Sequence, residues 1–186
     1  MLNTYMTYKN NILVSLPSVV DNSFNKSVIY LHNYTGDGAS GWIINKQLDD
    51  NISATLRKNM KLHVNVPIYY GGPVNITQAF VLHSNDLKLP QTITLTNALS
   101  VTRDRSIINL FNAGQFPINW KIIVGESSWG AGQLESELLG SRSGGISSWA
   151  TAPFSTNLVW DTNFSDMWDA GIRTSAAQLT NTVLNF

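Results

Sequence analysis

The chain has 186 residues, of which 43% are hydrophobic and six are tryptophan, enough for one folded domain over residues 1–186 and too apolar for a disordered chain. Twelve basic and twelve acidic side chains cancel, so no net charge favours a nucleic acid or an anionic membrane. The absence of cysteine excludes disulfides, cysteine nucleophiles, and zinc or iron–sulfur sites with thiolate ligands.

The first predicted element is a strand over residues 12–16, an apolar run that Pro17 ends. We expect residues 1–11 before it to form a frayed tail. No apolar run reaches the ~20 residues that a membrane span requires. We therefore expect a cytoplasmic protein without a membrane segment.

A β-hairpin is predicted next. Residues 28–31 and 42–44 form two apolar runs of strand length, and residues 32–38 connect them. The connection contains Asp37-Gly38, a pair that favours hairpin turns. Beyond it, Ile52 and Leu56 recur at a spacing of four residues, as in the amphipathic helix that we predict over residues 52–62.

The central part of the chain contains two further predicted strands. Residues 64–70 lead into the Gly71-Gly72-Pro73 turn, and residues 79–82 follow it. Pro67 places the first of these strands at a sheet edge or bulge, because proline lacks the N–H group that a central strand requires.

The last third of the chain continues the mixture of helices and strands. The predicted elements are a helix that ends at Gly114, a strand over residues 121–124, a helix containing Leu134 and Leu138, a strand over residues 158–160, and a helical region over residues 164–179. The elements show no regular alternation of strand and helix. The pattern therefore predicts a mixed α+β domain.

Four segments together resemble the bacterial YqgE/AlgH family, in that family's order, between about residue 13 and about residue 168. They are Leu16-Pro17-Ser18 with Asp21, Phe24 and Ser27–Tyr30; Gly41–Lys46; Gly71–Val74 with Phe80–His83; and Trp129–Leu138. The resemblance implies an α+β fold in which a bifurcated mixed β-sheet curls into a pseudo-barrel flanked by helices. It implies little about activity, because the family is largely uncharacterised and only some members have been called transcriptional regulators.

Two departures from the family pattern affect chemistry. Family members often carry cysteine two residues after the tyrosine of the first motif, where this chain has His32. Thiol chemistry proposed for relatives therefore cannot operate here. The family's Gly-Tyr-Ala-Gly/Ser-Trp run is Gly125-Glu126-Ser127-Ser128-Trp129 in this chain.

Ser127 is the candidate for a catalytic nucleophile. A strand, Gly125-Glu126-Ser127 and then a helix have the layout of a nucleophile elbow. The second glycine of that motif is replaced by Trp129, and no Asp–His pair can be assigned to the serine. A hydrolase-like enzyme centred on Ser127 therefore remains the alternative to a protein that is not an enzyme.

The segment from Trp129 to Glu135 is interpreted as a structural motif. Gly130 and Gly132 lack the third glycine of a dinucleotide fingerprint, and acidic Glu135 would repel a bound phosphate. We predict that Trp129 is buried and that the glycines lie at a strand–helix junction before Gln133. The three histidines do not have the spacing of metal ligands, so we expect no metal site and no cofactor.

A binding surface is expected at two other segments. Asp21, Asn45, Lys46 and the turn Gly71-Gly72-Pro73 would form it, and each polar side chain could instead bind loop backbone. On this basis we predict a cytosolic, non-catalytic binding or regulatory domain that contacts a protein or a small molecule.

A transcriptional regulator with direct or indirect DNA association is the further alternative. The basic cluster in the sequence is Arg57, Lys58 and Lys61, a set that commonly forms a solvated helix surface. No recognition helix or interleaved aromatic and basic pattern is evident. The sequence therefore disfavours direct nucleic-acid binding.

Overall fold

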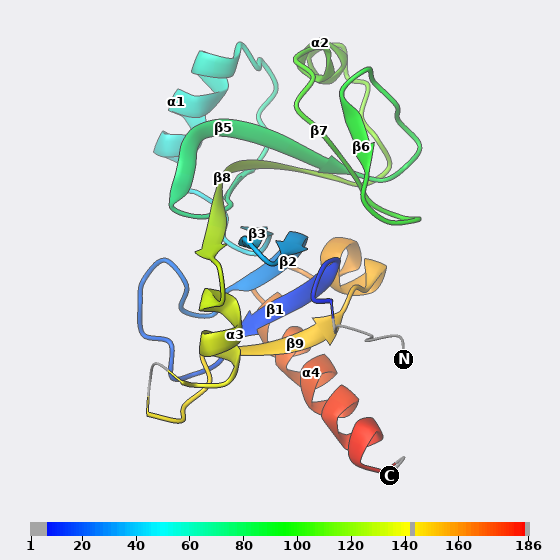
Figure 1. The fold of residues 1–186 in the computed structure, drawn as a ribbon. Coiled ribbons are helices and arrows are strands. Elements are labelled where there is room, and N and C mark those ends of the chain that lie inside the picture. Colours follow the sequence, from blue (N-terminus) through cyan, green and yellow to red (C-terminus); the bar gives the residue numbers. More distant parts are fainter. Residues whose placement is uncertain (1–6, 142–143, 185–186) are drawn as a thin grey trace.

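The computed structural model describes residues 7–141 and 144–184, and over these ranges the strands form one bifurcated, nine-stranded sheet. The strand order is β6-β7-β5-β8-β3-β2-β1-β9, and β4 lies beside β8 outside this path. The β4–β8 pair is parallel, whereas β8 is antiparallel to β3 and β5. The predicted α+β class, with a curled, bifurcated mixed sheet flanked by helices, is confirmed (Figure 1).

The sheet has two halves that share β8. The lower half in Figure 1 contains β1 (Asn11–Ser15), β2 (Val28–Thr35), β3 (Gly38–Ile43) and β9 (Trp149–Pro153). The upper half contains β4 (Ile68–Tyr70), β5 (Val74–His83), β6 (Thr92–Thr94), β7 (Ser100–Thr102) and most of β8 (Trp120–Gly130).

Helices cover both halves. In Figure 1, α1 (Asp50–Met60) and α2 (Ser106–Asn112) lie above the upper half, α3 (Gln133–Leu138) follows the end of β8, and α4 (Met167–Leu184) runs beneath β1 and β9. A π-helical segment, η1 (Asn157–Asp161), precedes α4. None of the helices in the described ranges has the length and apolar character needed to cross a membrane.

The core fills the space inside the curled sheet and continues on both outer faces. Ile12 and Val14 of β1 face the interior, where Leu82 of the upper half meets them in the same buried cluster. Leu13 points to the opposite face and packs in a second cluster with Trp129. Strand β1 is therefore buried on both faces, which explains its unbroken apolar run.

Strand β8 joins the two halves by changing its partners at Gly125. Before this residue, Ile122 to Val124 pair with both β4 and β5, and after it Ser127 to Gly130 pair with β3. The φ angle of Gly125 is 79°, a left-handed conformation that glycine adopts without strain. Val74 of β5 still pairs with Glu126, so the sheet divides at Gly125-Glu126.

Gly71 holds the two halves together at this point. Its N–H donates to the Val124 carbonyl at 2.8 Å, and its own carbonyl accepts from the Ile43 N–H at 2.9 Å and from the Ser127 hydroxyl at 3.1 Å. A Cβ atom on Gly71 would lie 2.2 Å from the Gly125 carbonyl oxygen. Only glycine fits at this position.

The predicted hairpin is confirmed, although its strands are longer than expected. Strand β2 continues to Thr35 and β3 begins at Gly38, so that Gly36-Asp37 alone form the connection. The register shifts between Leu31 and Asn33, which makes His32 a bulge in β2. The polar residues predicted as loop belong to this exposed end of the hairpin.

Two predictions need correction, one about residues 158–160 and one about the N-terminal tail. The strand expected over residues 158–160 is the helical segment η1, and the last strand is Trp149–Pro153. Leu158 and Val159 are buried in the interior core, and a short buried apolar run has no periodicity that distinguishes strand from helix.

A frayed tail is predicted over residues 1–11, and residues 1–6 lie outside the described part of the chain. For Asn10 and Asn11 the prediction is wrong, because Asn10 is hydrogen-bonded and Asn11 begins β1. The Asn10 N–H donates to the Leu31 carbonyl at 2.8 Å, and its amide oxygen accepts from the Tyr30 hydroxyl at 2.8 Å. The Asn10 amide nitrogen donates to the Leu95 carbonyl at 3.3 Å. The partly buried Tyr30 hydroxyl requires a partner, and the tail provides it.

We expect Gly71→Ala to lower the free energy of unfolding by about 3 kcal/mol or more, because its methyl group overlaps rigid backbone at the bifurcation. Gly36→Ala is the matched control: neither glycine has a positive φ angle, and nothing lies within 4 Å of a Cβ atom on Gly36. The control should stay within about 0.5 kcal/mol of the parent. Urea denaturation measures both, and equal effects would contradict the role assigned to Gly71.

Candidate functional site

The predicted site residues Asn45 and Lys46 hold the loop that precedes β2. The Asn45 amide oxygen accepts from the Val28 N–H at 2.8 Å, and its amide nitrogen donates to the Lys26 carbonyl at 2.9 Å. The Lys46 ammonium donates to the Asn22 and Ser23 carbonyls, each at 2.9 Å. Both side chains thus bind loop backbone, one of the two roles left open by the sequence.

Asp21 belongs to the same loop. Its carboxylate accepts from the Ser23 N–H at 2.7 Å, which closes a turn within the loop. Partial burial lowers the pKa of Lys46, and the negative charge of Asp21 opposes this shift. The charge of Asp21 therefore favours the protonated form of Lys46.

The Gly71-Gly72-Pro73 turn lies beside Asn45 and Lys46, as the sequence analysis expected. The Tyr70 N–H donates to the Lys46 carbonyl at 2.8 Å. Gly71 and Gly72 are buried against β8, whereas Pro73 is exposed. The backbone of the two glycines approaches other backbone closely at this point.

We expect Asn45→Ala to lower the free energy of unfolding by roughly 1–3 kcal/mol, because it leaves the buried Val28 N–H without an acceptor. Lys46→Ala should cost less than about 1 kcal/mol, since the released carbonyls can be hydrated at the exposed end of the lysine. Thermal or urea unfolding of the two variants tests this order. A larger loss for Lys46→Ala would show that the ammonium is the principal anchor.

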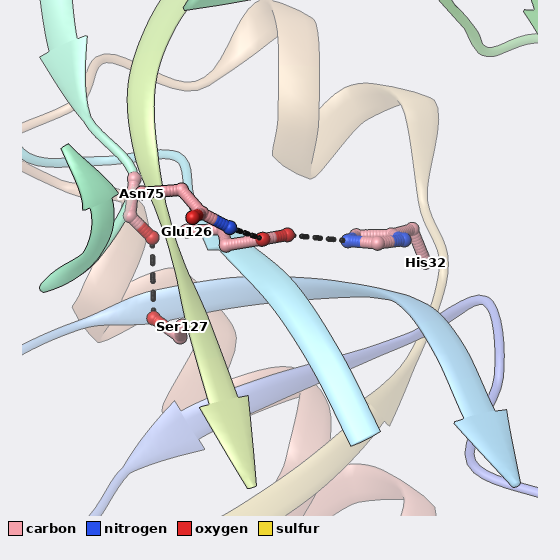
Figure 2. Close-up of polar contacts among 5 residues, drawn as sticks. His32, Asn75, Glu126 and Ser127 are labelled. Atoms are coloured by element: carbon pink, nitrogen blue, oxygen red, sulfur yellow. Dashed lines mark hydrogen bonds and ion pairs between the residues drawn. The ribbon is translucent and has the colours of Figure 1, made fainter. Parts of the chain in front are cut away.

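Ser127 does not have the geometry of an activated nucleophile. The residue is fully buried, and its hydroxyl donates to the Gly71 carbonyl at 3.1 Å (Figure 2). Strand β8 continues through it to Gly130, so no sharp strand-to-helix turn exposes the hydroxyl. Across residues 7–141 and 144–184, no histidine ring hydrogen-bonds to this hydroxyl, the geometry that serine activation requires.

The prediction for the Trp129 segment is confirmed. Trp129 is 5% exposed, β8 ends at Gly130, and α3 begins at Gln133 after Gly132, whose φ angle is 68°. The Gln133 amide oxygen accepts from the Gly130 N–H at 3.1 Å and closes the junction.

Two glutamates of α3 complete this structural motif. The Glu137 carboxylate accepts from the indole N–H groups of Trp129 at 2.9 Å and Trp149 at 2.7 Å. Glu135 accepts from the Tyr34 hydroxyl at 2.6 Å, and this bond is the main reason why the pKa of Tyr34 rises to about 12. These carboxylates are engaged inside the protein.

A polar cluster that the sequence analysis did not assemble joins β2 and β8 across the intervening strand β3. The His32 Nε2 atom is 3.5 Å from the Glu126 Oε2 atom, and Glu126 also accepts from the Asn75 amide nitrogen (Figure 2). The His32 ring stacks on Trp42, with ring centroids 3.9 Å apart. His32 and Glu126 are the two departures noted in the sequence, and the fold brings them together.

Opposing influences act on the pKa of His32. Burial lowers it, because the surrounding protein solvates the imidazolium poorly, and the Lys9 charge also lowers it. The Glu126 carboxylate raises it by charge and hydrogen bonding, but burial dominates. The ring is therefore neutral near pH 7.

Because the folded-state pKa of His32 is below its unfolded value of about 6.5, the unfolded chain binds more protons in acid. The contribution of His32 should therefore destabilise the fold as the pH falls below about 6.5. Glu126→Gln removes the group that raises this pKa and should move the His32 titration to lower pH. An NMR titration of the imidazole measures both proteins, and an unchanged or higher pKa in the variant would contradict the assigned influence of Glu126.

A cleft of about 790 Å³ lies between α1 and α2 on the outer face of the upper half. We call it the α1–α2 cleft. Ala79 of β5 and Val124 of β8 belong to its lining, together with Leu56 of α1 and Ile107 of α2. The lining also includes polar side chains from both helices and from β5, among them Asn59, Gln78 and Ser106.

Hydrogen bonds fix the relative positions of the two helices. The Asn112 amide at the end of α2 donates to the Lys61 carbonyl at 2.9 Å and accepts from the His63 N–H at 2.7 Å. On α1, the Arg57 guanidinium donates to the Val66 carbonyl at 2.8 Å. The walls of the cleft are thus preformed. Sequence reasoning missed the cleft because its two helices lie far apart in the chain.

The cleft also lacks the residues of a metal centre. Within the described ranges, no group of three or more histidine, aspartate or glutamate side chains is arranged to hold a metal ion. The single carboxylate of the cleft lining, Asp104, accepts from the Ser106 N–H at 3.0 Å and from its hydroxyl at 2.8 Å.

Comparison with known proteins gives concordant results. The model of a family described as AlgH-like matches residues 12–180. A UPF0301 protein of Klebsiella pneumoniae is 30% identical over 172 residues, which cover 88% of this chain and 89% of that protein. A UPF0301 protein of Vibrio parahaemolyticus is 28% identical over 176 residues, 90% of this chain and 91% of the relative. These names state no activity.

Two solved structures share the fold. The solution structure of the AlgH protein from Pseudomonas aeruginosa matches with a TM-score of 0.72 and 27% identity, covering 94% of this chain and 92% of that one. The crystal structure of a Corynebacterium diphtheriae protein matches with a TM-score of 0.64 and 18% identity, covering 88% and 85%. The second likeness concerns the fold alone.

Proposed function

The chain belongs to the AlgH-like family, and we propose that it is a cytoplasmic, non-catalytic binding domain that takes a small-molecule ligand in the α1–α2 cleft. The cleft carries the proposal, because its 790 Å³ lies within the range of roughly 300–1,000 Å³ typical of ligand sites. Its lining combines apolar and polar side chains, which is the mixed character of such sites.

A binding role is favoured over catalysis by the composition of the cleft. None of the residues that line it is a histidine, and its carboxylate, Asp104, is engaged by Ser106. A general base and a nucleophile within hydrogen-bond reach of each other are the minimum for acyl transfer. In the cleft lining the Ser106 hydroxyl donates to the Asp104 carboxylate at 2.8 Å, and the same oxygen accepts from the Ser106 N–H. We assign this contact to the local turn that it closes before α2, and the cleft to ligand binding.

The site predicted at Asn45, Lys46 and the Gly71-Gly72-Pro73 turn has a supporting role in this proposal. Its polar groups anchor the loop before β2 and the bifurcation of the sheet. A regulatory function would arise when the ligand changes the surface that α1 and α2 present to a protein partner. Such regulation requires no direct DNA contact.

Replacing Ala79 with Phe should fill the floor of the α1–α2 cleft and exclude its ligand. Two fluorescent probes test this: 8-anilinonaphthalene-1-sulfonate and the uncharged N-phenyl-1-naphthylamine. At least one should bind the parent saturably, and Ala79→Phe should weaken that binding at least tenfold.

Thr55→Phe is the matched control, since Thr55 is exposed on α1 and does not line the cleft. It should leave probe affinity unchanged. Circular dichroism and thermal unfolding should be used to check that both variants fold. Saturable binding that Ala79→Phe leaves intact, or no saturable binding of either probe, would overturn the proposal.

A further inference from the structure

We infer that the α1–α2 cleft selects organic anions, molecules with an aliphatic or aromatic body and a carboxylate, sulfonate or phosphate group that Lys61 and Arg105 bind. This inference rests on the proposed function, because it names the class of ligand that the same cleft takes. It is carried by the distribution of charge around the cleft and by two of its cations, for which residues 7–141 and 144–184 provide no partner.

The lining of the cleft is basic, although the whole chain is neutral. Lys61, Arg103 and Arg105 line it, and Asp104 is the one acidic residue among the lining residues. Twelve basic and twelve acidic residues balance over the full sequence. Positive charge is therefore concentrated at this cleft, where it attracts an anion.

Two of these cations are free to bind a ligand. In the part of the chain that the structure describes, neither the Lys61 ammonium nor the Arg105 guanidinium has a hydrogen bond or ion pair with another side chain or with backbone. Arg103 differs, because its guanidinium lies over the Phe80 ring, 5.4 Å from the ring centroid. The Asp104 carboxylate is engaged by Ser106 and does not neutralise them.

The two cations belong to different walls of the cleft. Lys61 is the C-terminal cap of α1, with a φ angle of 59°, and the Asn112 side chain of α2 holds its backbone carbonyl. Arg105 directly precedes α2. An anion between the walls would therefore interact with α1 and α2 together.

The rest of the lining requires an apolar body on the ligand. Leu56, Met60 and Ile107 belong to the walls, and Ala79 and Val124 to the floor. A volume of about 790 Å³ far exceeds that of an inorganic anion. Burial of apolar ligand surface against this lining is favourable, so an amphipathic anion fits better than inorganic phosphate.

The two naphthylamine probes test this selectivity directly, because they share one aromatic body and differ by the sulfonate. The parent protein should bind the sulfonate at least tenfold more tightly than the uncharged probe. The double variant Lys61→Gln/Arg105→Gln should abolish this preference by weakening sulfonate binding about tenfold, with little change for the uncharged probe.

The control is the double variant Lys58→Gln/Lys88→Gln, which removes the same charge from exposed residues outside the cleft lining. It should retain the preference for the sulfonate. Arg105→Gln alone provides a second test with the α1 cap unchanged, and it should give an intermediate loss. An equal effect of the control and cleft variants would overturn the inference, since the overall charge would then explain binding.

The outcomes separate the inference from the proposed function. One outcome is that both probes bind with equal affinity, that Lys61→Gln/Arg105→Gln leaves this affinity unchanged, and that Ala79→Phe abolishes binding. The cleft then binds ligands but does not select anions. The inference then fails and the proposed function stands. If Ala79→Phe leaves the binding of both probes intact, the proposed function fails, and the inference fails with it.

Discussion

The two halves of the sheet stay together because the backbone of Gly71 and Gly72 packs directly against the backbone of β8. Strand β8 serves both halves of the sheet, and it exchanges its partners at Gly125. The Gly71 backbone bonds to Val124, Ile43 and Ser127 at this point, and so connects β4, β3 and β8. A side chain at Gly71 would separate these strands.

Some polar side chains of this protein hydrogen-bond to its own backbone, and others are available to bind a ligand. Asn45 accepts from the buried Val28 N–H, and the Ser127 hydroxyl donates to the Gly71 carbonyl, which also accepts from the Ile43 N–H. Lys61 and Arg105 have no such partner within the described ranges, and both line a cleft. Their place in the cleft lining distinguishes these two exposed cations from other exposed cations such as Lys58 and Lys88.

The contact between His32 and Glu126 links the hairpin to the strand that joins the two halves. The bulge in β2 places the His32 ring on Trp42, and the change of partners at Gly125 gives Glu126 its position on β8. The fold thus places a carboxylate within 3.5 Å of this histidine.

Four features could be predicted from the amino-acid sequence: the α+β class, the hairpin, the strand–helix junction at Trp129 and the family. Each depends on residues close together in the chain or on a strong apolar pattern. Three others follow from long-range packing: the helical state of Leu158 and Val159, the anchoring of Asn10, and the pairing of His32 with Glu126. The α1–α2 cleft also belongs to this second group, since its walls come from helices far apart in the sequence. Short apolar runs carry no periodicity that separates strand from helix, and contacts between distant residues depend on how the sheet curls.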